Sequence, residues 1–334
     1  MAPIAEFPAP WLNWIAENQA RGVPPADIIR ILVDNGFDAH AAHDQVARAG
    51  GHPPAAAKPA VQKPAKADSL MAIYSGLWKT RGRAEVDRLT GLSGADFFRW
   101  YYAHNRPVVL LDAMHDWPAL DRWSPDYLGA RCGNPLVEVM TGRAADSQYE
   151  LNSERHKTKM PLDQFLHWIR TAGETNDFYM VANNRSFDSG NLRLLLEDIR
   201  LFDGILDPSN VAARLFFWFG PAGTVTPLHH DVMNVLLAQV VGRKLVTLIP
   251  SFETHLVYNR VGVYSEVDVE APDYSRYPLF RDVSRHQVLL QPGEALFIPV
   301  GWWHHVRSLD VSISVSFTNF LAPNEYAWEN GRYE

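Results

Sequence analysis

Short apolar runs separated by glycine and proline follow one another along the chain beyond residue 213. The runs are rich in β-branched and aromatic residues and are too short for helices, so they predict β-strands. The predicted strands are residues 215–219, 235–240, 245–249, 287–290, 295–298, 304–307 and 312–317. Many short strands at this spacing are typical of a mainly β sandwich or barrel.

A mixture of helical and extended patterns precedes this strand-rich part. Residues 94–102, 161–170 and 191–201 carry apolar side chains at helical spacing and predict helices. Residues 106–111 and 178–181 are short apolar or aromatic runs that predict strands. The barrel or sandwich should therefore have helices added on its N-terminal side.

Residues 8–49 predict a small, separate helical unit. Apolar residues recur in it at helical spacing, and Gly22, Pro24 and Gly36 separate its helices. A unit of about 40 residues buries little apolar surface and is marginal by itself. We therefore expect residues 1–49 to dock or to oligomerise, which predicts a homo-oligomer formed through these helices.

Residues 50–68 mark the clearest boundary in the chain. They contain four prolines, six alanines and three lysines but no large apolar residue. This composition is typical of an extended, semi-flexible linker. The predicted organisation is thus a helical unit (1–49), a linker (50–68) and a main domain (69–334).

Composition limits the class of protein. Hydrophobic residues make up 47% of the chain, enough for a large core, and the net charge is −7. Because nucleic-acid binders usually carry a basic field, this balance predicts no nucleic-acid partner. The single cysteine, Cys132, excludes an intramolecular disulfide and any metal site built from cysteines.

Neither a secretion signal nor a membrane span is expected. The first residues, MAPIAEFPAPWLNW, have no basic start and no unbroken apolar run. No stretch approaches the roughly 20 apolar residues that a membrane helix needs. We therefore expect a soluble, cytoplasmic protein in a reducing compartment, which also suits a ferrous ion.

The candidate chemistry lies in two clusters, His229-His230-Asp231 and His304-His305. Side chains two apart on a strand share a face, so His229 and Asp231 can reach one ion while His230 points away. A third ligand would come from the second cluster, where only one of the two histidines can face the interior. Two histidines and one carboxylate leave three of six coordination positions open, enough for a 2-oxo acid and dioxygen, as in non-heme Fe(II) oxygenases.

Lys244 lies fifteen residues after His229, at the start of a predicted strand. Such a lysine is often only a solvated strand end, but near a metal it could pair with the far carboxylate of 2-oxoglutarate. Thr226 and Tyr179 could add hydroxyl donors to that carboxylate. Alternatively, Thr226 is only a turn residue and Tyr179 is only a residue of the hydrophobic core.

These residues resemble a known family. Residues 223–231, 236–244 and 291–304 closely resemble the JmjC-type, cupin-like Fe(II)- and 2-oxoglutarate-dependent oxygenases, most of all the small JmjC hydroxylases such as the asparaginyl hydroxylase of hypoxia-inducible factor. Additional similarity to a JmjC-only arginyl hydroxylase and to bacterial cupin-like proteins lies in residues 264–268, 271–273 and 277–280. The resemblance covers roughly residues 80–320.

The resemblance implies a double-stranded β-helix (a jelly roll) with N-terminal helical decoration. By position it implies Fe(II) ligation by His229, Asp231 and His304, the first histidine of the tandem pair. It also implies that Lys244 binds the distal carboxylate of 2-oxoglutarate with help from the hydroxyl groups of Thr226 and Tyr179.

Two positions depart from the family pattern. Val235 stands six residues after the first ligand, where the small hydroxylases often have an asparagine, and Asn234 directly precedes it. Ser316 stands where the asparaginyl hydroxylase has an asparagine late in a strand. We expect Ser316 to contact the co-substrate and both departures to change the fine geometry of its binding.

The predicted activity is hydroxylation of a C–H bond, on a protein or peptide side chain, with 2-oxoglutarate and O2 consumed and succinate and CO2 released. Two alternatives remain open: a JmjC-type demethylase and a non-catalytic cupin-fold binding or sensor module. A different cupin metalloenzyme is disfavoured, because its usual His-x-His cluster with a nearby glutamate is not found.

Overall fold

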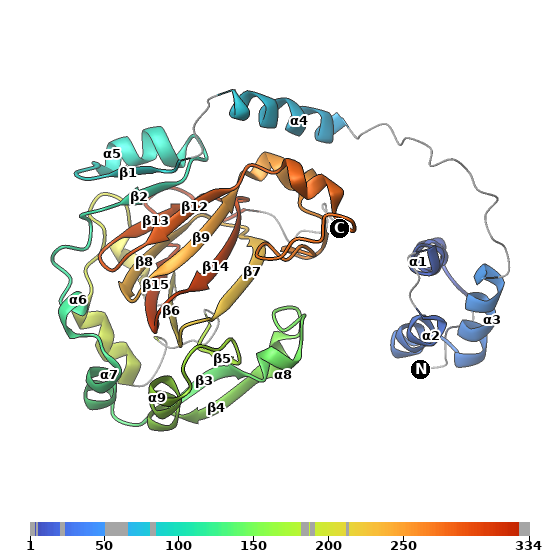
Figure 1. Ribbon diagram of the computed structural model, residues 1–334, viewed down its shortest axis with the longest axis horizontal. Helices are drawn as coiled ribbons and strands as arrows, with labels where there is room; N and C mark the ends of the chain where they lie inside the picture. Colours follow the sequence, from blue (N-terminus) through green and yellow to red (C-terminus); the bar gives the residue numbers. More distant parts are fainter. Residues whose placement is uncertain are drawn as a thin grey trace. The chain divides into compact units, whose positions relative to one another are not determined.

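The computed structural model describes residues 4, 6–20, 24–50, 66–80, 85–181, 187, 191–211 and 214–326. The chain divides into two compact units, Met1–Pro64 and Ala65–Glu334 (Figure 1). Residues 51–65 of the predicted linker and the helix stop at Gly22 lie outside the described residues.

The first unit contains the three expected helices, which are α1 (Ala9–Ala20), α2 (Pro25–Asp34) and α3 (Ala39–Gly50). Its core is a small cluster of buried side chains around Phe37, namely Ile15, Ile28, Leu32, Phe37, Ala42 and Val46. Trp11 and Trp14 pack against this cluster, and Trp11 contacts the Phe37 ring edge-on at 5.1 Å. The unit therefore has a core of its own, although a small one.

The second unit is built on two six-stranded sheets. The first has the strand order β1 (Asp87–Leu89), β2 (Val108–Leu110), β13 (Ala295–Ile298), β8 (Val235–Val241), β15 (Ser312–Phe317) and β6 (Leu215–Gly220). The second has the order β10 (Asn259–Val261), β11 (Tyr264–Ser265), β7 (Val225–His230), β14 (Trp303–Ser308), β9 (Lys244–Ile249) and β12 (His286–Leu290). All pairs except β1 with β2 are antiparallel, and the fold is the predicted jelly roll with helical decoration.

Helices and a small third sheet surround this barrel. The sheet has the order β4 (Lys157–Pro161), β3 (Leu136–Thr141) and β5 (Phe178–Tyr179). The α-helices are α4 (Lys66–Lys79), α5 (Gly94–Phe97), α6 (Ala119–Arg122), α7 (Pro125–Cys132), α8 (Ser153–His156) and α9 (Leu162–Thr171). In Figure 1, α6, α7 and α9 lie along one flank of the barrel. Helix α4 starts at Lys66, inside the segment that was predicted as linker.

Strand alternation separates the core from the interior of the barrel. On β6, Leu215, Phe217 and Phe219 belong to the main hydrophobic core beneath the helices, whereas Phe216 and Trp218 line a pocket on the other side. On β15, Val315 and Phe317 enter that core and Ser316 lines the pocket. Because successive side chains of a strand face opposite ways, one strand contributes both to the hydrophobic core and to the lining of the pocket.

The predicted helix at residues 191–201 is a 3-10 helix, Asn191–Asp198. Leu192, Leu195 and Asp198 are buried along it at a spacing of three. This spacing is the period of a 3-10 helix, although it also fits one face of a short α-helix. Further 3-10 segments are Arg143–Ala145, Pro208–Asn210, Ser251–Leu256 and Pro278–Asp282, and a π-helical turn, Phe98–Tyr102, follows α5.

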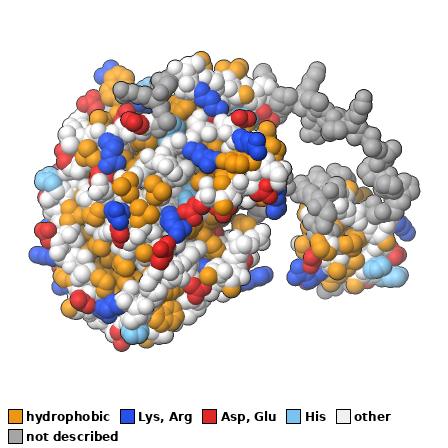
Figure 2. Space-filling model, in the orientation of Figure 1, with side chains coloured by type: hydrophobic (Ala, Val, Ile, Leu, Met, Phe, Trp, Pro, Cys, Tyr) orange, Lys and Arg blue, Asp and Glu red, His pale blue; other side chains and the backbone are white. Residues whose placement is uncertain are grey.

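The visible surface of the second unit carries acidic and basic side chains interspersed with one another (Figure 2). Among the described residues, none of the helices combines the length and the apolar character that crossing a bilayer requires.

Removal of the Asp198 carboxylate should destabilise the helical flank. This carboxylate accepts hydrogen bonds from Arg122 Nη1 (2.8 Å), Trp123 Nε1 (3.2 Å) and the Tyr127 hydroxyl (2.6 Å). We expect Asp198→Ala to lower the free energy of unfolding by about 2–3 kcal/mol, because three donors, one of them the buried Trp123 indole, lose a charged acceptor. Urea denaturation tests this, with exposed Asp121→Ala as the control; equal midpoints for the two variants would contradict it.

Candidate metal centre

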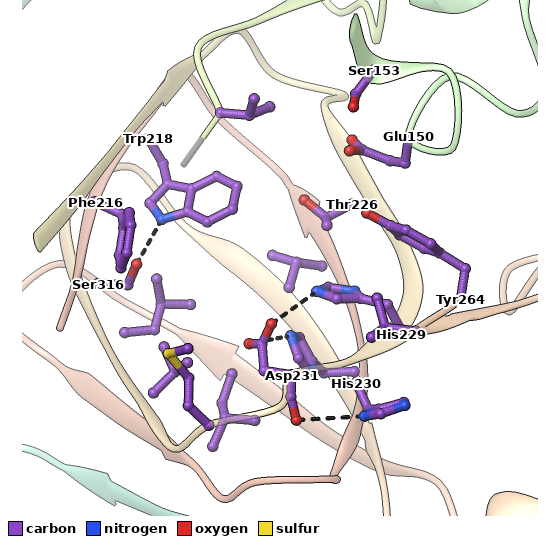
Figure 3. A pocket seen from close by; sticks show the side chains of 18 of the residues that line it. Glu150, Ser153, Phe216, Trp218, Thr226, His229, His230, Asp231, Tyr264 and Ser316 are labelled. Atoms are coloured by element: carbon purple, nitrogen blue, oxygen red, sulfur yellow. Dashed lines mark hydrogen bonds and ion pairs between the residues drawn. The ribbon is translucent and has the colours of Figure 1, made fainter. Parts of the chain in front are cut away.

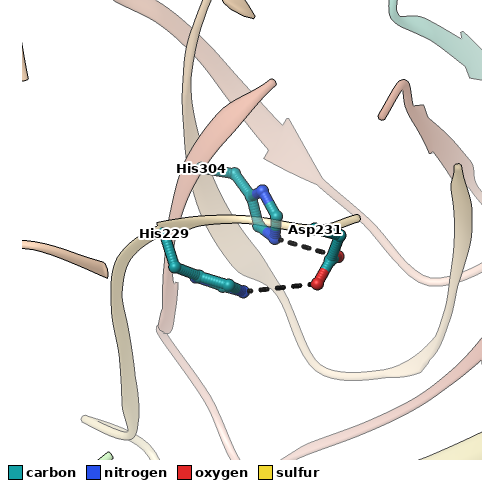
Figure 4. Close-up of side chains that lie close together, drawn as sticks. All are labelled: His229, Asp231 and His304. Atoms are coloured by element: carbon teal, nitrogen blue, oxygen red, sulfur yellow. Dashed lines mark ion pairs between the residues drawn. The ribbon is translucent and has the colours of Figure 1, made fainter. Parts of the chain in front are cut away.

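Two neighbouring strands bring the ligand candidates together. His229 on β7 lies directly opposite His304 on β14 in the antiparallel register, and Asp231 follows one residue after β7 ends. The backbone of Asp231 is held by the Gly301 N–H, which donates to its carbonyl at 3.0 Å. One potential ligand atom from each of the three side chains lies within 4.8 Å of the others (Figure 4).

The distances within this triad are those of groups facing a common point. Nε2 of His304 lies 3.5 Å from Asp231 Oδ2, and Nε2 of His229 lies 3.9 Å from Asp231 Oδ1. The two imidazole rings are 4.0 Å apart between centroids. The triad is therefore placed to bind a metal ion.

The tautomer of each histidine is fixed by a backbone carbonyl. Nδ1 of His229 bonds to Pro227 O at 2.8 Å, and Nδ1 of His304 bonds to Trp302 O at 3.0 Å. Because a carbonyl oxygen only accepts, each Nδ1 carries the proton and each Nε2 turns a lone pair toward the carboxylate. This second layer of hydrogen bonds is what orients histidines that bind metals.

Electrostatics favour a cation at this point. Burial lowers the pKa of His304 to about 3, so the ring is neutral at physiological pH. Imidazole nitrogens of His229 and His304 and the Asp231 carboxylate converge here, and a divalent cation would stabilise this concentration of electron density. The donor set of two nitrogens and carboxylate oxygen fits a transition metal such as Fe(II) and leaves coordination positions on the pocket side.

The other two histidines of the tandem pairs lie outside the triad. His230 packs edge-on against the Trp303 ring at 4.7 Å between centroids. His305 faces a second cavity on the outer side of the sheet. Of the five candidate ligands in the sequence, the structure brings together His229, Asp231 and His304.

The triad opens into a pocket of about 410 Å³ between the two large sheets (Figure 3). Its walls are mostly apolar or aromatic, and they include Phe216, Trp218, Val235, Leu237, Ile298 and Val306. The predicted co-substrate residues Lys244, Thr226, Tyr179 and Ser316 also line it. Figure 3 shows Thr226, Ser316, His229 and Asp231 around the same hollow.

Lys244 is an ionisable side chain buried in the wall of this mostly apolar pocket. Its side chain is 2% exposed, its Nζ lies 3.3 Å from the Tyr179 hydroxyl, and it sits near the faces of Tyr179 and Trp218. Burial lowers its pKa from 10.5 to about 7. Within the described part of the chain no carboxylate forms an ion pair with it, so the pocket has room for an external anion at this point.

Ser316 and Val235, the two positions that depart from the family pattern, and the neighbouring Asn234 have different surroundings in the structure. Ser316 Oγ accepts a hydrogen bond from Trp218 Nε1 at 2.9 Å, so its own proton remains available to a ligand. Val235 lines the pocket as an apolar wall. Asn234 instead ties loops together, accepting from Val300 N at 2.9 Å and donating to Asn324 Oδ1 at 2.9 Å.

Sequence reasoning missed several lining residues. Trp218 gives no signal beyond its place in a strand, and Glu150 comes from an irregular segment where it pairs with buried Arg143 at 2.9 Å. Tyr264 lay in a stretch that resembles the family, but nothing in the sequence indicated that its ring lies 5.7 Å from that of His229.

Comparison with known proteins agrees with this geometry. Residues 94–320 match the family of the cupin-like domain. The chain is 38% identical over 239 residues to lysine-specific demethylase JMJ30 of Arabidopsis thaliana, covering 70% of this chain and 54% of that protein. It is 36% identical over 223 residues to lysine-specific demethylase 8 of Xenopus tropicalis (65% and 48%).

A third relative is covered more completely. The chain is 30% identical over 251 residues to tRNA wybutosine-synthesizing protein 5 of Gallus gallus, covering 70% of this chain and 76% of that protein. By contrast, it spans about half the length of the two demethylases. The chain belongs to the cupin-like, JmjC-type family of Fe(II)- and 2-oxoglutarate-dependent oxygenases.

The triad should bind one divalent ion per chain. After treatment with a chelator, we expect Mn(II) to bind stoichiometrically in isothermal titration calorimetry. Asp231→Ala and His304→Ala should each weaken binding by at least about 100-fold, because loss of a ligand costs more than loss of an orienting partner. Exposed His115→Ala serves as the matched control; retention of wild-type affinity by Asp231→Ala would contradict the assignment.

Proposed function

We propose that this chain is an Fe(II)- and 2-oxoglutarate-dependent oxygenase that hydroxylates a C–H bond of a protein or peptide side chain. Succinate and CO2 would be the co-products. The observation that carries the proposal is one pocket with the triad of two histidines and a carboxylate on one wall and buried Lys244 on another.

His229, Asp231 and His304 would hold the iron, which when bound supplies the activation of O2 and the oxidising chemistry. The protein's part is to fix these ligands through the carbonyls of Pro227 and Trp302 and to leave the pocket side of the ion open. The apolar walls exclude water from the reacting centre, which strengthens each electrostatic interaction inside it.

Lys244 would bind the distal carboxylate of 2-oxoglutarate. A buried ammonium and a carboxylate form a strong, orienting pair, and the hydroxyl groups of Tyr179, Thr226 and Ser316 can donate to the same anion. Trp218 keeps the Ser316 oxygen in place from behind. This arrangement directs the 2-oxo acid end of the co-substrate toward the triad.

A demethylase is the second candidate, favoured by the names of two relatives. Both outcomes begin with hydroxylation of a C–H bond. When the carbon is an N-methyl group, the hydroxymethyl product loses formaldehyde and leaves N–H. The detection of formaldehyde, as against a stable product with one added oxygen atom, separates the two candidates.

Exchange of the buried lysine should weaken co-substrate binding without harming the fold. We expect Lys244→Met to weaken 2-oxoglutarate binding by about 10–100-fold in the Mn(II)-loaded protein, because a charged hydrogen-bonding partner is lost. The apo-protein should be no less stable, since no buried charge remains. Exposed Lys159→Met is the control, and tight binding by Lys244→Met would remove this role.

Binding of 2-oxoglutarate should depend on pH with a definite sign. Below about pH 7 Lys244 is already protonated in the empty pocket, so the Kd should be constant. Above pH 7 the lysine must take up a proton on binding, so the Kd should rise about tenfold per pH unit until the pKa of the complex is reached. Burial raises the pKa of Tyr179, which therefore stays neutral throughout this range.

The measurement is calorimetric titration with 2-oxoglutarate between pH 6 and pH 9. In Lys244→Met the remaining weak binding should not change with pH. A Kd for the wild type that falls on going from pH 7 to pH 8.5 would show that the lysine does not act as proposed.

A further inference from the structure

A second cavity, of about 1000 Å³, adjoins the metal pocket on the outer side of the β7–β14 sheet. The two cavities share Glu150 and Tyr264 as lining residues, so they adjoin each other at these side chains. The second cavity has more than twice the volume of the first, which is too much for a single substrate side chain. We call it the outer groove.

One border of the outer groove is the segment Glu266-Val267-Asp268-Val269-Glu270, which directly follows β11. Its side chains alternate in burial. Val267 and Val269 are buried in a hydrophobic cluster that includes Phe280, whereas the three acidic side chains are exposed. The alternation places three carboxylates along the groove.

The cations of the outer groove leave part of this charge uncompensated. Arg307 pairs with Glu174 at 2.7 Å and with Glu270 at 3.0 Å, and Arg276 lies over the ring of Tyr277. Asp268 forms no ion pair among the described residues. Its Oδ1 accepts the backbone N–H of Glu270 at 2.8 Å, and its Oδ2 accepts no hydrogen bond within the described chain.

An independent observation comes from His305. Its side chain is only 5% exposed and lines the outer groove, yet it forms no hydrogen bond in the described part of the chain. The metal centre does not use this ring, because strand alternation turns it away from His304. The ring nitrogens of a histidine can donate or accept hydrogen bonds, so a molecule bound in the groove can supply a partner for His305.

We propose that the outer groove is the docking site for an extended basic segment of the substrate polypeptide. The carboxylate of Asp268 would pair with a lysine or arginine, and the ring of His305 would bond to the peptide backbone. This inference rests on the proposed function, because the shared wall at Glu150 and Tyr264 lets one polypeptide occupy the groove while its modified side chain enters the metal pocket.

The charge of the groove selects this occupant. Five carboxylates line it against two arginines, and Glu150 is paired with Arg143. A polypeptide with basic side chains complements the remaining excess. A polyanion would meet repulsion along the same border. A segment of a few residues, rather than one side chain, fits the volume of the outer groove. Such a segment also has main-chain groups that can form a hydrogen bond with the ring of His305.

The test measures the fluorescence anisotropy of fluorescein-labelled hexalysine with the full-length protein loaded with Mn(II) and 2-oxoglutarate. We expect Asp268→Asn to weaken binding by about tenfold, the effect of losing one charged hydrogen-bonding partner. Asparagine keeps an oxygen that can accept the backbone N–H of Glu270, so the local turn is preserved. Asp121→Asn removes the same charge from an exposed site elsewhere and should bind like the wild type.

Three results would overturn the inference: no binding of hexalysine by the wild type, equal affinities of Asp268→Asn and Asp121→Asn, or equally strong binding of hexaglutamate. None of these would touch the proposed function, which fails separately if Mn(II) and 2-oxoglutarate do not bind at the triad and Lys244. Asp231→Ala provides the converse control, since it should lose the metal and still bind hexalysine.

Discussion

The register of β7 against β14 is the constraint on which the site depends. It sets His229 opposite His304, and the end of β7 one residue later allows Asp231 to turn toward both rings. A shift of one residue would exchange His304 for His305 and send the ligand to the outer face. The same register therefore produces the triad inside the barrel and also places His305 in the outer groove.

The described residues of the protein do not by themselves compensate the polar groups that face the pocket. Lone pairs and a carboxylate converge at the triad, and a lysine with a pKa of about 7 is buried at the other wall. Each would be stabilised by a group of opposite character, a divalent cation in the first case and an anion in the second. A dicarboxylate that chelates the metal would satisfy both demands at once, which is why the two features together are more specific than either.

Much of this could be predicted from the sequence, because strands encode their two faces with a period of two. The pattern predicted the strand-rich barrel and the separation of His229 from His230, and the resemblance to the family selected His304 over His305. Sequence could not reveal that residues 191–198 form a 3-10 helix, because period three and period 3.6 are hard to distinguish over so few turns. Nor could it reveal Glu150 or the outer groove, since these depend on how irregular segments pack against the sheet.

The most direct test of the central claim is turnover under ¹⁸O2 with the iron-loaded protein and a cell lysate as the source of substrate. We expect the wild type, and not Asp231→Ala, to form succinate that carries one ¹⁸O atom. A hydroxylase would place the second ¹⁸O atom in a polypeptide product, and a demethylase would release it in formaldehyde. Unlabelled succinate, or equal labelling with the wild type and Asp231→Ala, would show that the triad does not support 2-oxoglutarate-dependent oxygenation.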